Sequence, residues 1–404
     1  MTRDEARALD AADPLRGFRD RFALPDDVIY LDGNSLGPLP HATPSQIDRL
    51  THRQWGDRLI RSWNEGWIDA PQRIGDKIAG LIGAAPGEVI VCDSTSINLF
   101  KLIVAALQRD PHRKTIVSEA GNFPTDLHMA QGAVGCISGA TLKSVPREQL
   151  AGSLDGHTAL LLLTHVHYKS ADRFDMADWT RRAHAAGAMV LWDLSHSTGA
   201  VPIDLNAAGA DLAVGCGYKY LNGGPGAPAF LFVAERWQDQ LANPLSGWMG
   251  HAAPFAFTDD YAPATGIRRW LTGTPAMLSM TALESGIDVM LDADMGAIFA
   301  KSAALFDALA AIGDTLGLEC VSPRDPAVRG SHISFRHADA YAICQALIAR
   351  GVIGDFRDPD IIRFGLTPLY LRFDDVWRAG EILREVLRCE SFRDPVYQTR
   401  HAVT

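Results

Sequence analysis

Residues 218–226 read Tyr-Lys-Tyr-Leu-Asn-Gly-Gly-Pro-Gly, so that a lysine ends an apolar run and is followed by a glycine- and proline-rich turn. A lysine becomes a nucleophile near neutral pH when burial or nearby cations lower the pKa of its amine, and glycines let the backbone approach a planar ligand closely. The stretch therefore indicates a site for an aldehyde cofactor. Apolar strands often end in a surface lysine, so Lys219 alone does not decide the matter.

A carboxylate ends a second apolar run upstream. Residues 188–192 read Ala-Met-Val-Leu-Trp, as in a buried strand, and Asp193 follows directly. A carboxylate at such a strand end is costly to desolvate without a cationic partner. Pyridoxal 5'-phosphate (PLP) supplies one, because its protonated ring nitrogen needs an anion while a lysine forms a Schiff base at the other end of the ring. Asp193 and Lys219 fit these two roles and predict a PLP enzyme.

Short apolar runs alternate with helical patterns through the middle of the chain. Strands are expected at 88–91, 114–117, 159–163 and 188–192, with helices near 96–108 and 176–186. This rhythm predicts an α/β fold with a mostly parallel, doubly wound sheet. The runs 211–215 and 229–233 lack a long helix between them, so one of these strands could be antiparallel.

The last third of the chain has a different pattern. It is helical from about residue 278 to 316, and short strands then mix with helices, which predicts a smaller α+β domain. We expect an N-terminal arm (1–50) that joins this small domain, a large PLP-binding domain (51–285) and a small C-terminal domain (286–404).

The composition is that of an ordinary soluble globular protein, with 404 residues, 47% hydrophobic and 21% charged. The net charge of -10 and the lack of a basic run argue against nucleic acid or an anionic membrane as partner. The six cysteines have no metal-ligand spacing, which predicts buried, reduced thiols in a cytoplasmic protein. The N-terminus lacks an apolar signal segment, and no run of eighteen apolar residues predicts a membrane helix.

Small hydroxyl residues open the helix expected near residue 96. Thr95 and Ser96 could bind a phosphate together with the spare N–H groups of the helix N-terminus, or they could be ordinary N-caps. Tyr218 could place its hydroxyl on the same phosphate or donate a proton, or it could be a packed aromatic.

The segment Asn122-Phe123-Pro124-Thr125-Asp126 puts an aromatic ring on a constrained loop after a strand. Phe123 could stack on a pyridine ring and Asp126 could hold its phenolic side. The segment is equally compatible with a plain turn followed by a helix cap.

Three other features carry weaker signals. Arg363 stands alone in an apolar strand, where it could clamp a carboxylate or form a buried ion pair with an acidic residue. Trp248 lies on a glycine-flanked loop, which favours an indole N–H aimed at a ligand. His165 and His167 share one face of a strand but have no evident third ligand, so we expect no metal.

Taken together, these motifs resemble the kynureninase family, of the aspartate-aminotransferase-like fold (fold type I) of PLP enzymes, over nearly the whole chain. The resemblance is carried by residues 30–37, 96–99, 122–126, 192–196, 217–226, 273–275, 329–332 and 363–365.

The resemblance implies hydrolysis of L-kynurenine to anthranilate and L-alanine, in tryptophan catabolism and pyridine nucleotide biosynthesis, by a homodimer with shared active sites. It implies that Lys219 forms the Schiff base, that Asp193 faces the ring nitrogen and that Phe123 stacks on the ring. It also implies that Thr95, Ser96 and Tyr218 bind the phosphate, and that Trp248 and Thr274 reach the phosphate from the other subunit. The remaining cofactor-shell residues that it implies are Pro124, Thr125, Asp126, Thr164 and His196.

For the substrate, the resemblance gives the α-carboxylate to Arg363, with Asn34 and Ser35 nearby. Trp63 and Thr274 would lie near the aryl ring, where animal enzymes that favour 3-hydroxykynurenine are expected to carry His and Asn. The difference implies a bacterial-type preference for kynurenine. The implied catalytic residues are Lys219, Asp193 and Tyr218. Tyr218 would protonate the β-carbon left after cleavage, and we expect the neighbouring lysine to make its phenol more acidic, against the opposing effect of the phosphate.

Two alternatives remain. Another fold type I enzyme, an aminotransferase or a cysteine desulfurase, is the first, but a desulfurase needs a cysteine on a mobile loop and none lies between 321 and 343. The second is a PLP-binding protein without catalysis.

Overall fold

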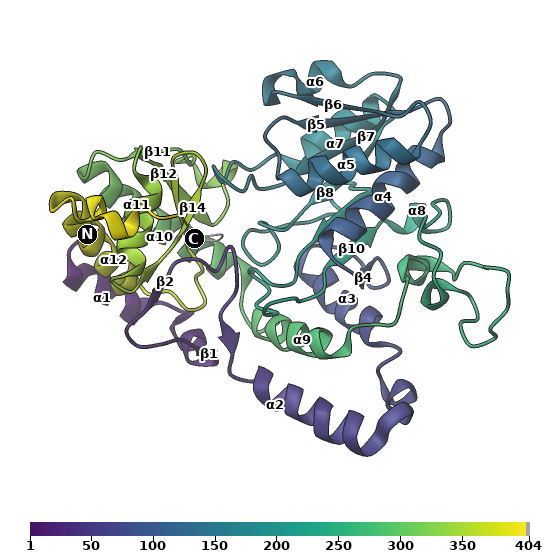
Figure 1. The fold of residues 1–404 in the computed structure, drawn as a ribbon, viewed down its shortest axis with the longest axis horizontal. Coiled ribbons are helices and arrows are strands. Elements are labelled where there is room, and N and C mark those ends of the chain that lie inside the picture. Colours follow the sequence, from purple (N-terminus) through teal and green to yellow (C-terminus); the bar gives the residue numbers. More distant parts are fainter. Residues whose placement is uncertain (401–404) are drawn as a thin grey trace.

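The computed structural model describes residues 1–400 and contains two main sheets, seen on either side of Figure 1. The larger sheet has seven strands in the order β4-β10-β9-β8-β7-β5-β6. All of its neighbours are parallel except β10, which is antiparallel to both β4 and β9. The strands are β4 (Val89–Val91), β5 (Thr115–Glu119), β6 (Thr141–Val145), β7 (Thr158–Thr164), β8 (Met189–Asp193), β9 (Leu212–Gly215) and β10 (Phe230–Val233). This is the predicted doubly wound α/β sheet.

Helices cover both faces of this sheet, which is why its strands are apolar throughout rather than alternating. On one face, Leu160, Leu162 and Leu191 pack in a cluster with residues of α4 (Thr95–Arg109) and α5 (Pro124–Cys136). On the other face, Leu161 and Trp192 join a cluster with residues of α3 (Ala70–Leu81), α7 (Met176–Ala185) and α9 (Met277–Leu291).

The smaller sheet is antiparallel, in the order β11-β12-β15-β14. Its strands are β11 (Glu319–Cys320), β12 (His332–Arg336), β14 (Asp355–Arg357) and β15 (Ile361–Gly365). The helices α10 (Met295–Thr315) and α11 (Ala340–Ile348) pack on it, and α12 (Phe373–Arg388) packs on both of these helices. Figure 1 shows the smaller sheet beside the large one, and Arg363 of β15 donates a hydrogen bond to the carbonyl of Tyr168, in the segment after β7.

The N-terminal arm joins the smaller sheet. Its helix α1 (Arg3–Ala12) packs on α12, and β2 (Ile29–Tyr30) pairs in parallel with β13 (Val352–Ile353). The strands β1 (Phe22–Ala23) and β3 (Leu39–Pro40) pair with each other before α2 (Thr43–Asp48), which continues into the helical segments 49–58 and 59–65. The short helices α6 (Leu150–Ser153) and α8 (Glu235–Gln238) complete the set.

Helix α10 is long and apolar enough to cross a membrane by length and composition alone. It nevertheless packs on α12 and β12, and its Lys301 pairs with Asp13 at 2.6 Å, contacts that are typical of a core helix. The expectation of buried thiols is confirmed for Cys92, Cys216 and Cys344. It is wrong for Cys136 and Cys389, which are exposed at helix ends, and Cys320 is only partly buried.

Candidate active site

A small cavity lies at the carboxyl ends of β7, β8 and β9, where parallel strands of an open sheet present their ligand-binding loops. It is lined by Thr95, Ser96, Phe123, Thr125, Asp126, Thr164, Tyr168, Asp193, Ser195, His196, Tyr218 and Lys219. Ten of these twelve residues were singled out from the sequence. Pro124 lies between two of them, as the first residue of α5.

Lys219 is buried in this cavity, and its Nζ lies 2.9 Å from His196 Nε2. Burial lowers the pKa of Lys219, and Arg363 and Arg357 lower it further against the opposing charges of Cys216 and Asp193. Burial and the charge of Lys219 hold the pKa of His196 well below its usual range. The neutral imidazole can therefore accept a hydrogen bond from Lys219, whose amine is poised to lose its proton.

Two carboxylates lie opposite the lysine. Asp193 ends β8 and accepts a hydrogen bond from Ser195 N at 2.7 Å, and Asp126 accepts one from Thr164 Oγ1 at 2.9 Å. Burial raises the pKa of both, and the charge of Asp193 raises that of Asp126 further. Among residues 1–400, Asp126 Oδ1 and His196 Nδ1 are buried without a hydrogen-bond partner. A buried polar atom without a partner costs free energy unless a ligand supplies the missing hydrogen bond.

The opening turn of α4 closes another side of the cavity. Ser94 is the N-cap and accepts from Ile97 N, so the helix begins at Thr95 with the N–H groups of its first turn free of helical partners. Phe123 is the N-cap residue of α5, and its ring lies 5.2 Å from that of Tyr168 and 5.8 Å from Lys219 Nζ. Together with the two carboxylates, these features fit a planar aromatic phosphate that has a cationic ring nitrogen.

Tyr218 differs from expectation in one respect. Burial raises the pKa of its phenol, and the charges of Cys216 and Asp193 raise it further. The prediction that the neighbouring lysine makes the phenol more acidic is therefore wrong, because desolvation and these two neighbours shift the pKa in the opposite direction. The Tyr218 hydroxyl keeps its proton.

Arg363 lies directly behind the cavity and is fully buried. It pairs with Asp355, with Nε 2.8 Å from Oδ1, so the alternative of a buried ion pair is realised. The guanidinium also donates to the carbonyl of Tyr168, a cavity residue, at 2.5 Å and to Ser35 Oγ at 2.9 Å. Asn34 is buried beside it, with its Oδ1 close to Gly365 and without a hydrogen-bond partner within residues 1–400.

Three predicted residues lie outside the cavity. Trp248 is 42% exposed and packs edge to face on Phe255, at 5.6 Å between ring centroids. Thr274 is exposed in the segment before α9, and Trp63 is half-buried against Trp67 at 5.5 Å. Within this one chain the structure does not bring these three side chains to Lys219.

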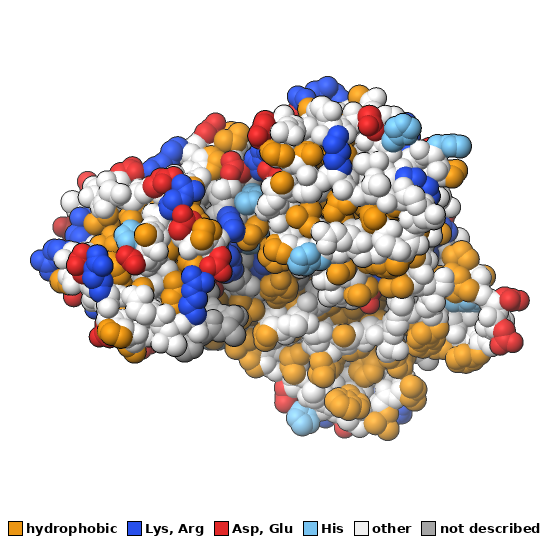
Figure 2. Space-filling model, turned by 45° about the horizontal axis from the view of Figure 1, so that its top comes forward, with side chains coloured by type: hydrophobic (Ala, Val, Ile, Leu, Met, Phe, Trp, Pro, Cys, Tyr) orange, Lys and Arg blue, Asp and Glu red, His pale blue; other side chains and the backbone are white. Residues whose placement is uncertain are grey.

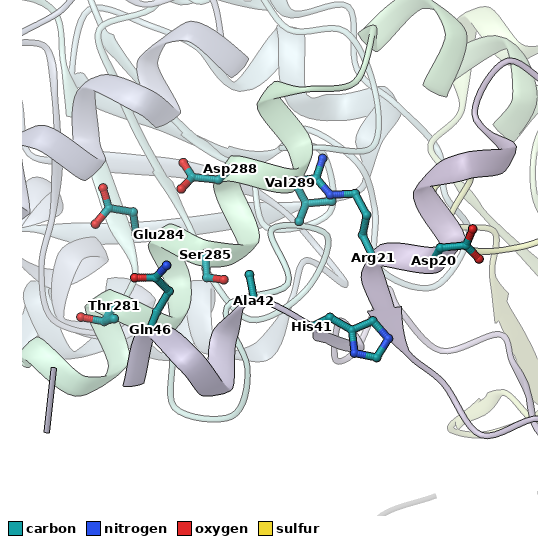
Figure 3. Close-up of a pocket in the computed structure, with 10 residues that line it drawn as sticks. All are labelled: Asp20, Arg21, His41, Ala42, Gln46, Thr281, Glu284, Ser285, Asp288 and Val289. Carbon is teal, nitrogen blue, oxygen red and sulfur yellow. The ribbon is translucent and has the colours of Figure 1, made fainter. Parts of the chain in front are cut away.

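Other titratable groups have structural partners. His165 Nδ1 lies 2.9 Å from Ser197 Oγ, and His167 Nε2 lies 3.0 Å from the carbonyl of Gly121. A separate hollow between the N-terminal arm and α9 is shown in Figure 3. Two of its acidic residues, Glu284 and Asp288, both pair with Lys77 and form a surface ion-pair network.

Sequence reasoning missed three residues of this region. Tyr168 follows a strand at 158–164, and its place after two histidines gave a faint signal. Ser195 contributes its backbone N–H, which no side-chain pattern can reveal. Asp355 pairs with Arg363 across an antiparallel pair of strands, a contact that depends on register.

Comparison with known proteins agrees with this geometry. Residues 298–383 match the model of the kynureninase C-terminal domain. The chain is 51% identical to a kynureninase of Burkholderia pseudomallei (strain 1106a) and 48% identical to one of Pseudomonas fluorescens, in each case over 100% of both chains.

Solved structures share the fold at low identity. The apo structure of a cysteine desulfurase from Thermococcus onnurineus NA1 matches with a TM-score of 0.79 at 17% identity, covering 92% of this chain and 98% of that one. A C-DES mutant with glycine covalently linked to the PLP cofactor matches with a TM-score of 0.78 at 17% identity, covering 90% and 98%. The fold is therefore fold type I, and the full-length identity to curated kynureninases shows that the chain belongs to the kynureninase family.

Proposed function

We propose that this protein hydrolyses L-kynurenine to anthranilate and L-alanine by cleaving the Cβ–Cγ bond, with PLP as its cofactor. The observation that carries the proposal is the arrangement of Lys219, Asp193 and Arg363. A buried amine of lowered pKa, an anion at a strand end and an arginine behind the cavity are the groups that a PLP enzyme acting on an amino acid requires.

The cofactor would be held by the cavity residues. Lys219 would form the Schiff base, Asp193 would face the ring nitrogen and Phe123 the ring. The phosphate would lie at the start of α4, with Thr95, Ser96 and Tyr218. Pro124, Thr125, Asp126, Thr164 and His196 would complete the shell. When bound, PLP withdraws electrons from the substrate α-carbon and makes its proton removable.

The protein's own groups move the protons. The Lys219 amine, with its lowered pKa, can take the α-proton at Nζ. The Tyr218 hydroxyl keeps its proton at neutral pH and can therefore deliver it to the β-carbon after cleavage. Arg363 binds the substrate α-carboxylate, and Asn34 and Ser35 line the same region, from a loop of the N-terminal arm.

We also propose that Trp63 and Thr274 contact the substrate aryl ring and favour kynurenine over 3-hydroxykynurenine. In this proposal the protein is a cytoplasmic homodimer in tryptophan catabolism and pyridine nucleotide biosynthesis, and Trp248 and Thr274 serve the partner's site. Each subunit would comprise the arm (1–50), a large domain (51–285) and a small domain (286–404).

Exposed apolar side chains support the dimer. Figure 2 shows hydrophobic side chains gathered on the lower part of one face. Exposed large hydrophobic residues include Trp55, Leu59 and Ile60 after α2, and Trp248, Phe255 and Phe257 in the loop around 246–262. Side chains of this size are commonly covered by a partner subunit.

An anthranilate fluorescence assay tests the function. Purified, PLP-loaded protein is offered L-kynurenine and 3-hydroxy-L-kynurenine separately, with Lys219→Ala as the inactive control. We expect rapid release of anthranilate and slower use of the hydroxylated substrate. If neither substrate gives product, the proposed reaction is wrong, and equal rates would refute the proposed roles of Trp63 and Thr274.

A further inference from the structure

The guanidinium of Arg363 is held in place by charged and polar side chains. Asp355 occupies one edge of it, with Nε 2.8 Å from Oδ1 and Nη2 in contact with Oδ2. Ser35 Oγ accepts from Arg363 Nη2 at 2.9 Å and donates to Asp355 Oδ2 at 2.6 Å. Arg357 adds a second cation, with its Nη2 2.7 Å from Asp355 Oδ2. Asp355 therefore fixes the orientation in which Arg363 can meet a ligand.

Asp355 is ionised in this arrangement. Burial alone would raise the pKa of its carboxyl, but Arg363, Arg357 and the hydrogen bond from Ser35 together lower it to about 2. Two guanidinium groups and a hydroxyl donor stabilise the charged form of this carboxylate, so it stays ionised near neutral pH.

Asp32 brings a second carboxyl to this region. The residue before it, Leu31, accepts a backbone hydrogen bond from Gly365 at the end of β15 at 2.7 Å and donates one to Ile353, two residues before Asp355, at 2.7 Å. Asp32 directly follows the β2 region of the arm, and its backbone carbonyl accepts from Ser35 N at 2.9 Å. Its Oδ1 is shielded from solvent and has no hydrogen-bond partner among residues 1–400. Burial and the charge of Asp355 raise the pKa of Asp32 to about 8, against the opposing effects of Arg363 and Ser35.

The surroundings of Asp32 offer few other charges. The remaining titratable groups that interact with it come from β2, the loop after Lys219, α11, the segment after β15 and β14, and they are Tyr30, Tyr220, Cys344, Tyr370 and Arg357. Burial keeps the three phenols and the thiol neutral, since it raises the pKa of each. The proton that can be exchanged in this cluster near neutral pH therefore belongs to Asp32, because Asp355 is ionised.

The charge of the cluster follows from that proton. With Asp32 neutral, two arginines face one carboxylate, which leaves one positive charge to attract an anion. With Asp32 ionised, the two carboxylates cancel the two arginines. We propose that Asp32 is a positioning residue that holds the proton on which carboxylate binding at Arg363 depends, so that substrate binds tightly only while Asp32 is neutral. This inference rests on the proposed function, because it places the substrate α-carboxylate at Arg363.

The sign of the pH effect follows by linkage. A bound carboxylate adds negative charge, which favours protonated Asp32 and draws a proton from solvent if Asp32 was ionised. Below about pH 8 the proton is already present and binding takes up none through Asp32. Above that pH, the dissociation constant rises by up to about tenfold per pH unit, and binding takes up most of one proton.

Benzoylpropionate, which is kynurenine without its two amino groups, tests the proposal because it offers the carboxylate but cannot form a Schiff base. Its binding to the PLP-loaded protein is measured by calorimetry at several pH values between 6.5 and 9.5, in buffers of different ionisation enthalpy. For the wild type we expect weaker binding and proton uptake at the alkaline end. In Asp32→Asn, which mimics the neutral acid, we expect pH-independent affinity and loss of that uptake.

Asp26→Asn is the matched control, since Asp26 is an exposed acid on the same arm, and it should behave as the wild type. Equal proton uptake by Asp32→Asn and wild type would overturn the role of Asp32. Constant wild-type affinity across this pH range would also overturn it, even if the variant failed to fold. Failure of the wild type to bind benzoylpropionate at pH 6.5 would instead overturn the proposed carboxylate site at Arg363, while anthranilate release from kynurenine tests the reaction separately.

Discussion

Arg363→Lys separates the charge of the carboxylate clamp from its shape. Lysine keeps the positive charge but loses the planar fork that lets a guanidinium bind two oxygens at once. In the structure Arg363 uses Nε and Nη2 for Asp355, and its other bonds go to Ser35 Oγ and the Tyr168 carbonyl. A single ammonium cannot serve Asp355 and a substrate carboxylate in these directions.

The expected size follows from these contacts. A hydrogen bond to a charged group contributes about 1.5–3 kcal/mol, so the loss of one to the substrate costs about 2 kcal/mol, or roughly a thirtyfold rise in KM. The fold should survive, because Asp355 keeps Arg357 at 2.7 Å and Ser35 at 2.6 Å. A buried charge that is left without a partner costs roughly 3–5 kcal/mol, and the free energy of unfolding should therefore fall by less than that.

Initial rates of anthranilate release over a range of kynurenine concentrations give KM and kcat separately, and absorbance gives cofactor content. We expect KM to rise while bound PLP stays unchanged, because Arg363 does not line the cofactor cavity. Arg336→Lys is the matched control, since Arg336 ends β12 of the same sheet and its side chain is 44% exposed. An unchanged KM in Arg363→Lys would refute the role of the Arg363 guanidinium in binding the substrate carboxylate.

Three further predictions concern the cofactor, packing and pH. Lys219→Ala should lose the absorbance of bound PLP in the visible range, and retention of that band would exclude Lys219 as the attachment point. Gly33→Ala should lower the free energy of unfolding in urea by about 1–3 kcal/mol, because a Cβ there would lie 2.2 Å from the Tyr370 hydroxyl, whereas Gly17→Ala, with nothing within 4 Å, should not. Burial lowers the pKa of His165 to about 3. Below about pH 6.5 the imidazole is therefore protonated in the unfolded chain but stays neutral in the folded protein. Through this group, the free energy of unfolding of the wild type should fall by about 2 kcal/mol between pH 7 and 5. His165→Gln should remove that part of the acid sensitivity in urea unfolding, and an unaltered pH dependence would show that His165 is protonated in the folded protein.

The large sheet and most of the cofactor cavity could be predicted from sequence because their signals are local. Asp193 and Lys219 each follow a short apolar run, and parallel strands place their carboxyl ends along one edge, so residues far apart in the chain meet there. The expected antiparallel strand is β10.

The carboxylate clamp was harder to predict because it depends on register and on the packing of the arm. Nothing in the sequence around Asp355 distinguishes it from a surface acid, and the motif at residues 30–37 gives Asp32 no role of its own. Their role appears only when β14 pairs with β15 and the loop after β2 lies over both. The direction of the Tyr218 pKa shift was missed for a related reason, since desolvation depends on what packs around a side chain and not on its neighbour in the chain.

The pairing of β2 with β13 also has a consequence for biosynthesis. These strands lie about three hundred residues apart, near opposite ends of the polypeptide. On the ribosome, Ser35 and Asp32 are made early but cannot reach Arg363 until almost the whole chain has emerged, whereas the strands around Lys219 can assemble sooner. A truncated or stalled product could thus contain the reactive lysine before it has the groups that select its substrate, and only complete synthesis would join the two.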